Sequence, residues 1–168
     1  MSTPATRDDS FWKLIDESRV GDSATATPER LAGTLKRLND DEVLDFGLTF
    51  YEKLCDLNQW RLWGAGYVIA AGMSDDSFHY FRSWIIGKGK AVFEVAMKDP
   101  DELGPYVDTD EVDNELLEYV AVKILEERGI EEDPRDRSDR RADDEPTGEP
   151  FAEETVAGSY PKLSALFG

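Results

Sequence analysis

The chain has 168 residues and carries 37 Asp and Glu against 19 Lys and Arg, which gives a formal net charge of −18 at pH 7. This length fits one domain, and four Trp, eight Phe and six Tyr supply enough apolar surface for a core. A charge this negative repels phosphate backbones, so the composition argues against nucleic-acid binding.

The sequence also predicts a cytoplasmic protein without membrane spans. The longest apolar stretch, Leu62–Met73, contains three glycines and is shorter than the roughly 18–20 residues that a membrane span needs. Met1–Ser10 contains no apolar run, so we expect no secretory signal. The single cysteine, Cys55, can form neither an internal disulfide nor a thiolate zinc cage, which agrees with a reducing compartment.

Apolar residues recur at helical spacing along the first 130 residues, and no alternating run indicates a strand. Thr27 precedes Pro28, as is typical of a helix start, and Asn39 with Glu42 three residues later resembles a capping box. The predicted helices cover residues 11–18, 28–38, 40–54, 59–71, 75–85, 92–97 and 110–128, with a stop at 20–22 after the first. We therefore predict an all-α fold, a compact bundle of about six to seven helices with a short C-terminal helix after an acidic linker.

The predicted helix at 59–71 is apolar almost all round, which is typical of a helix at the centre of a bundle. Gly72 follows it as a predicted left-handed C-cap. Ser74 is the predicted N-cap of the next helix, whose first turn carries Asp75 and Asp76 at the positive end of the helix dipole.

An acidic segment follows the last of these helices. Between residues 131 and 154 there are eleven acids against four arginines, with no Ile, Leu, Val or aromatic residue before Phe151. Such a segment cannot bury enough apolar area to offset an ordering entropy of about 1–2 kcal/mol per residue. We predict a helical domain at 1–130, a flexible linker at 131–150 whose deletion hardly changes the melting temperature, and a C-terminal segment at 151–168 that docks on the domain.

The stretch Trp60–Gly89 contains the pattern Gly-x-Ser-Asp-Asp-x-Phe-x-x-Phe-Arg-x-Trp-x-Ile. This block resembles the bacterial domain of unknown function 4240 family, and Phe11–Ile15, Asp99–Leu103 and Tyr160–Leu163 also match the layout of that family. The resemblance implies a compact, mostly helical cytoplasmic domain and brings no established reaction or ligand. The long acidic insertion before the C-terminal match departs from the family pattern.

A polar cluster inside this aromatic block is the main candidate site. Asp75, His79 and Arg82 lie at i, i+4 and i+7 and share one helix face, where Asp75 can orient His79 as a general base. Alternatively, Asp76 caps the helix or pairs with Arg82, and Arg82 braces loop backbone through its forked donors. Trp60 and Trp63 with Arg61 either edge an aromatic groove, or the tryptophans fill the core. Of these three we keep Trp60 and Arg61 as candidate binding residues. We assign these six residues to binding and none to catalysis.

Other motifs fail on their spacing. A single His cannot build a His-rich zinc centre, the acids from Asp108 to Asp113 lack the turn glycine of a calcium loop, and Gly87–Lys90 lacks the spacer of a phosphate loop. Cys55 is interpreted as a small buried hydrophobe. We therefore predict no metal and no cofactor.

Two functions follow as hypotheses. Because no catalytic set is complete, we expect a non-catalytic binding or regulatory module that engages a basic protein partner, of which an immunity or antitoxin-like role is one version. Nine acids and no bases between Asp99 and Glu118 form an electronegative strip, which is either a solvated face or part of such a surface. The alternative is a small-molecule-binding protein or enzyme with its site at Asp75, Asp76, His79 and Arg82.

Overall fold

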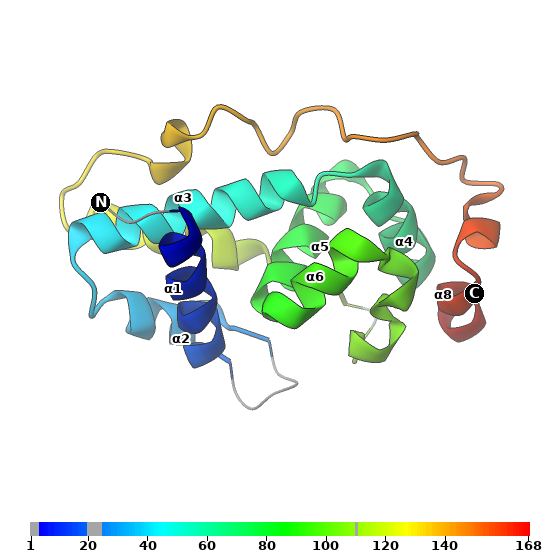
Figure 1. Cartoon of the computed structure of the whole chain (residues 1–168), viewed down its shortest axis with the longest axis horizontal. Helices are drawn as coiled ribbons and strands as arrows, with labels where there is room; N and C mark the ends of the chain where they lie inside the picture. Colours follow the sequence, from blue (N-terminus) through cyan, green and yellow to red (C-terminus); the bar gives the residue numbers. More distant parts are fainter. Residues whose placement is uncertain (1–3, 20–24, 110) are drawn as a thin grey trace.

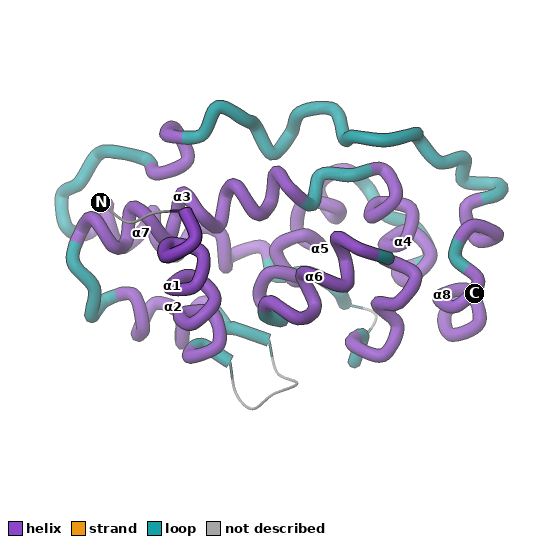
Figure 2. Tube along the Cα trace, viewed as in Figure 1, coloured by secondary structure: helices purple, strands orange, loops and turns teal. Residues whose placement is uncertain are grey.

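The computed structural model describes residues 4–19, 25–109 and 111–168. Its α-helices are α1 (Pro4–Glu17), α2 (Pro28–Leu35), α3 (Asp40–Asp56), α4 (Trp60–Ala70), α5 (Asp75–Gly87), α6 (Lys90–Lys98), α7 (Val120–Glu127) and α8 (Pro161–Phe167) (Figure 1). Short 3₁₀ helices are η1 (Pro100–Tyr106), η2 (Glu115–Tyr119), η3 (Pro134–Arg137) and η4 (Val156–Ser159). Over these ranges there is no strand, so the predicted all-α fold with a short C-terminal helix is confirmed (Figure 2).

The predicted N-caps are present, because each capping side chain accepts a hydrogen bond from the first turn of its helix. Arg30 N donates to Thr27 Oγ1 at 3.2 Å, Glu42 N to Asn39 Oδ1 at 2.9 Å, and Ser77 N to Ser74 Oγ at 3.2 Å. Asn39 N in turn donates to Glu42 Oε1 at 3.1 Å, which completes the capping box.

Several predicted boundaries differ from the structure. The first helix begins at Pro4 rather than near residue 11, and its predicted stop at 20–22 lies outside the described residues. The predicted helix at 110–128 is shorter, since α7 begins only at Val120. Asn114 explains this, because its N–H donates to Tyr80 O at 3.2 Å and its side chain donates to Ala26 O at 3.0 Å. These tertiary bonds hold Asn114 in a non-helical conformation.

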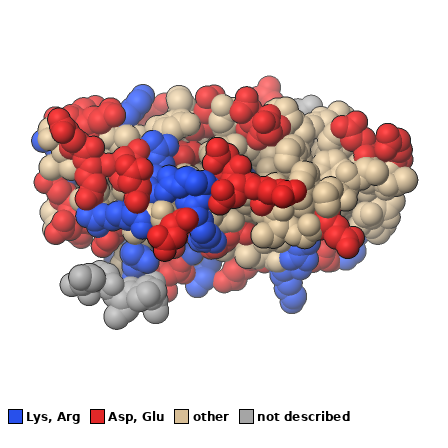
Figure 3. Space-filling model, turned by 90° about the horizontal axis from the view of Figure 1, so that it is seen from above, with Lys and Arg blue, Asp and Glu red and all other residues tan. Residues whose placement is uncertain are grey.

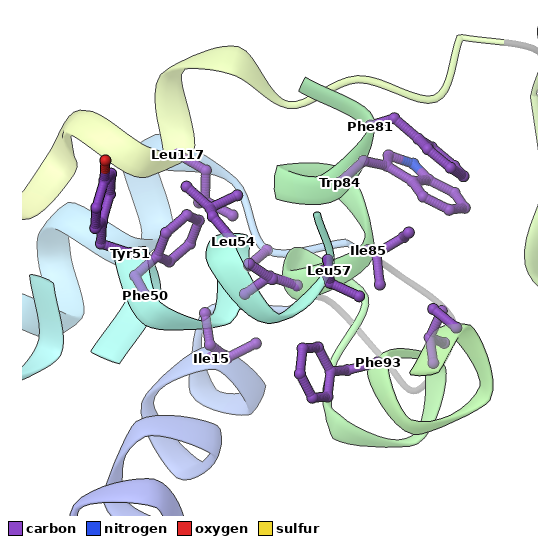
Figure 4. Packing of buried hydrophobic residues seen from close by; sticks show 14 of the residues in the cluster. Ile15, Phe50, Tyr51, Leu54, Leu57, Phe81, Trp84, Ile85, Phe93 and Leu117 are labelled. Atoms are coloured by element: carbon purple, nitrogen blue, oxygen red, sulfur yellow. The ribbon is translucent and has the colours of Figure 1, made fainter. Parts of the chain in front are cut away.

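The centre of the fold is α3, and the prediction that the helix at 59–71 lies there is wrong. Nine α3 residues are buried, and α3 contacts α1, α5 and α7. Its Leu54 and the adjacent Leu57 pack among side chains of α1, α5 and α6 (Figure 4). By contrast, α4 lies at one end of the molecule, where α8 covers part of its apolar surface (Figure 1). The left-handed C-cap of α4 is Ala71, with φ 56°, rather than Gly72.

Residues 131–150, which we call the strap, cross the molecule along α3 (Figure 1). The sequence predicts a linker without apolar contacts, but Pro134 and Ala142 are buried. Ala142 N donates to Tyr51 Oη at 2.9 Å, and Asn58 Nδ2 donates to Asp144 O at 2.7 Å. The strap therefore packs against the helical domain over much of its length.

The strap is attached mainly through its arginines. Arg135 bonds Asp133 within the strap at 2.6 Å and reaches Glu118 at 3.4 Å. Arg140 bonds Asp56 at 2.8 Å, and the Arg141 guanidinium lies 5.2 Å from the centre of the Tyr51 ring. The same hydrogen bond from Arg135 lowers the pKa of Asp133. Three of the four arginines in this acidic segment thus attach it to the helical domain.

The C-terminal helix docks on α4 and η1, and Gly64 provides the space for it. Tyr160 Oη donates to Arg61 O, and a Cβ at Gly64 would lie 2.7 Å from that same Oη.

We expect Gly64→Ala to lower the free energy of unfolding by about 1–3 kcal/mol, because the methyl group forces Tyr160 away. Chemical denaturation measures this loss.

Gly33→Ala is the matched control for that variant. Gly33 lies inside α2, and a Cβ there meets nothing within 4 Å. Alanine should therefore stabilise the protein by up to about 1 kcal/mol through helix propensity. If Gly64→Ala stabilises the protein as Gly33→Ala does, Tyr160 does not pack closely on α4.

Candidate functional site

One pocket of about 320 Å³, which we call the α5 pocket, is lined by all four residues of the predicted cluster: Asp75, Asp76, His79 and Arg82. It lies between α5, the end of η2 and the strap. The remaining walls come from Asn58, Trp63, Phe78, Tyr80, Tyr119 and residues 142–146. Side chains from both the helical domain and the strap therefore complete this cavity.

Arg82 forms part of the pocket wall and is only 3% exposed. Its Nη1 donates to Leu54 O at 2.9 Å, and its guanidinium lies 4.6 Å from the centre of the Phe78 ring. Burial lowers the pKa of Arg82 to about 10, so the side chain stays charged at neutral pH. This geometry matches the predicted bracing of backbone, whereas the predicted pair with Asp76 does not form.

His79 is oriented by Glu118 rather than by Asp75. Its Nε2 lies 2.6 Å from Glu118 Oε1, and its Nδ1 lies 3.5 Å from Arg82 Nη2. The guanidinium can only donate, so Nδ1 accepts a hydrogen bond, and Nε2 carries the N–H that donates to Glu118 Oε1. Both ring nitrogens therefore have a protein group beside them, Glu118 at Nε2 and Arg82 at Nδ1.

Glu118 links this histidine to the strap. Its side chain is 4% exposed, and its second oxygen lies 3.4 Å from Arg135 Nη1. A buried carboxylate needs such partners, because desolvation penalises an isolated charge. A continuous chain of polar contacts thus runs from the strap to α5, through Asp133, Arg135, Glu118, His79 and Arg82.

Five exposed carboxylates surround the pocket, and we call them the carboxylate rim: Asp75, Asp76, Asp143, Asp144 and Glu145. Asp75 Oδ1 accepts from Asp76 N at 2.9 Å, and Asp144 Oδ2 accepts from Arg141 N at 3.1 Å. The view onto the strap shows basic and acidic side chains clustered beside one another, with a broad uncharged surface towards α4 and α8 (Figure 3). Because the strap arginines bind within the protein, the rim itself is acidic.

Trp60 and Arg61 lie outside the α5 pocket. The Trp60 ring stacks on Trp63 with ring centres 5.2 Å apart, and Trp63 stacks on Phe78 at 4.8 Å. Arg61 donates to the carbonyl of Met97 and to Gln59 Oε1. Of the aromatic groove suggested by the sequence, only Trp63 reaches the pocket.

Sequence reasoning missed Glu118 as a member of the site, and the strap carboxylates as well. Glu118 stands between Leu117 and Tyr119 in an otherwise apolar run, which is a signal for a buried acid with a partner. No comparable signal marks Asp143–Glu145, because their placement depends on strap contacts with Tyr51 and Asn58.

The acids between Asp99 and Glu118 do not form one free strip. Asp108 bonds Lys88 at 2.9 Å, Glu102 pairs with Lys162, and Glu118 is buried.

In the described ranges no three His, Cys, Asp or Glu side chains gather as metal ligands. Cys55 is half-buried, and burial raises the pKa of its thiol.

The fold and site define an all-α protein with a small acidic-rimmed pocket beneath a strap. The model of a family described as protein of unknown function (DUF4240) matches residues 7–127, so the chain belongs to this family. No curated protein and no solved structure matches the chain. Among the residues that the structure describes, no helix is long and apolar enough to cross a membrane.

Proposed function

We propose that this protein is a non-catalytic binding module that engages a basic protein partner through the α5 pocket and its carboxylate rim. The supporting observation is that five exposed carboxylates, from two segments distant in the chain, flank one pocket in which the buried Arg82 is the only Lys or Arg among the described lining residues. A rim of this charge attracts lysine and arginine side chains and speeds their association.

The pocket chemistry favours binding over catalysis. Both nitrogens of His79 contact protein partners, and the described residues that line the pocket include no Ser, Thr, Cys or Lys to serve as a nucleophile. The proposal includes a cytoplasmic location, which the single free cysteine supports, and an origin in bacteria, which rests on the family resemblance. It includes no nucleic-acid ligand, since the net charge is −18.

Two charge-matched triple variants test this function. The rim variant carries Asp76→Asn, Asp143→Asn and Glu145→Gln, and the control carries Glu126→Gln, Glu127→Gln and Glu131→Gln at exposed positions outside the pocket. Both remove three negative charges, so they differ only in where the charge is lost. We expect cross-linking pull-downs at low salt to recover a basic partner with the wild type and control, and at least ten-fold less with the rim variant.

Salt provides an independent measurement in the same pull-down. Raising the ionic strength should weaken capture by the wild type and control, because exposed charges are screened beyond about 8–10 Å at physiological salt. If both triple variants recover the same basic protein equally, the rim is not the binding surface.

A small-molecule-binding protein is the second candidate. Its support is the cavity of about 320 Å³, which lies at the lower end of the roughly 300–1,000 Å³ typical of ligand sites. Thermal-shift screening against nucleotides, metal ions and metabolites tests this candidate, with His79→Ala as the pocket variant. A ligand that stabilises the wild type but not His79→Ala would favour it over the protein partner.

A further inference from the structure

Among the residues that the structure describes, Arg82 differs from the buried Lys88 in having no carboxylate partner. Lys88 has a side chain 4% exposed and bonds both oxygens of Asp108, at 2.9 and 3.1 Å. Arg82 is 3% exposed, bonds a carbonyl and approaches His79, and has no carboxylate within 4 Å among the described residues. In that part of the chain its Nε–H also has no acceptor.

This arrangement points to an anionic group on whatever binds at the inner end of the pocket. Buried guanidinium groups are stabilised best by carboxylates, which accept in the plane of the fork. Glu118, the buried carboxylate nearby, is instead shared between His79 and Arg135. An occupant with a carboxylate would therefore supply Arg82 with the direct ion pair that the described residues do not form with it.

The outer part of the pocket requires the opposite charge. Asp76, Asp143 and Glu145 line it, and within the described ranges none has a Lys or Arg at salt-bridge distance. Trp63, Tyr80 and Tyr119 add aromatic walls, against which an alkyl stem or a guanidinium packs favourably. A cationic side chain fits this outer region.

We propose that the α5 pocket takes a single arginine or lysine with a free α-carboxylate, the carboxylate beside Arg82 and the cationic side chain at the rim. This inference rests on the proposed function and names the part of the partner that enters the pocket. The chemistry is shared by the C-terminal residue of a basic protein and by a free basic amino acid. A volume of about 320 Å³ suits one such residue rather than a whole helix.

Isothermal titration of the full-length chain with four probes tests the inference. The probes are Gly-Gly-Arg with a free carboxylate, its C-terminal amide, L-arginine, and agmatine, which has the side chain but no carboxylate. We expect Gly-Gly-Arg or L-arginine to bind at least ten-fold more tightly than the amide and agmatine. Tighter binding of the tripeptide identifies a chain terminus as ligand, and tighter binding of L-arginine identifies a free amino acid.

Protein variants then locate the two contacts. The rim variant should lose binding of all four probes, and Arg82→Gln should remove the preference for the free carboxylate while keeping weak binding of the amide. The probe series on the wild type decides the question even if Arg82→Gln does not fold.

Equal affinity for the acid, the amide and agmatine would overturn the inference and leave the proposed function standing, since a cation would still bind at the rim. A second outcome would also overturn the inference but not the proposed function: no probe binds, while the rim variant still loses the captured partner. The proposed function fails by a different result, which is equal partner capture by the two triple variants.

Discussion

Arg82→Ala is expected to lower the free energy of unfolding by about 3–5 kcal/mol. The substitution removes a charged hydrogen bond to Leu54 O, worth roughly 1.5–3 kcal/mol, and leaves a cavity beneath Phe78. Arg82→Lys should lower the free energy of unfolding by roughly half as much, because an ammonium group cannot both donate to Leu54 O and stack on the Phe78 ring as a planar guanidinium does. Equilibrium denaturation in urea measures both losses.

Asp76→Asn is the control on the same helix. Asp76 is exposed on the rim, so its neutralisation should change the stability by less than about 0.5 kcal/mol. If Arg82→Ala unfolds at the same urea concentration as the wild type, Arg82 does not brace α3, and its role in the pocket is limited to ligand contact.

Replacing residues 133–147 with a Gly/Ser segment of equal length is expected to lower the melting temperature by about 6–12 °C. The replacement keeps the chain connected but removes the buried side chains of Pro134 and Ala142 and the Arg140–Asp56 pair. Without these anchors the strap backbone is no longer held on Tyr51 and Asn58, so its bonds to them are lost as well. A few net hydrogen bonds of about 0.5–1.5 kcal/mol each, with the lost apolar contacts, amount to about 3 kcal/mol. For a protein of this size each kcal/mol shifts the melting temperature by about 2–4 °C.

A double variant within the strap controls for the loss of exposed charged side chains, because it leaves these contacts in place. Arg137 and Asp139 are exposed, and Arg137 pairs only with Glu132 of the strap itself. Arg137→Ser with Asp139→Ser should therefore leave calorimetric melting unchanged within about 2 °C. A shift this small for the complete 133–147 replacement would instead support the flexible linker that the composition predicts.

The helices and their caps could be predicted because their signals are local. Thr27, Asn39 and Ser74 each act within three residues of their own position, and such spacings are visible in a single sequence. The beginning of α7 could not be predicted in this way. Asn114 bonds Tyr80 and Ala26, and these tertiary bonds outweigh the helical pattern of the residues that follow.

The candidate site was predictable for one wall only. The i, i+4, i+7 spacing places Asp75, His79 and Arg82 on one face of α5, and the structure brings them to one pocket. The opposite wall depends on the strap, whose composition indicates disorder. Arg140 finds Asp56 across 84 residues of sequence, and no local pattern encodes a partner at that distance.

The strap also affects the order in which a growing chain can complete its fold. Trp60 N donates to Thr147 O, and Tyr160 donates to Arg61 O, 99 residues earlier in the chain. During synthesis, Trp60 N and Arg61 O at the beginning of α4 therefore stay without these partners until nearly the whole polypeptide has been made. Contacts this distant close slowly, so a chain stalled before Phe151 lacks the ring that contacts both Trp60 and Trp63 and leaves their stack more open to chaperones and proteases.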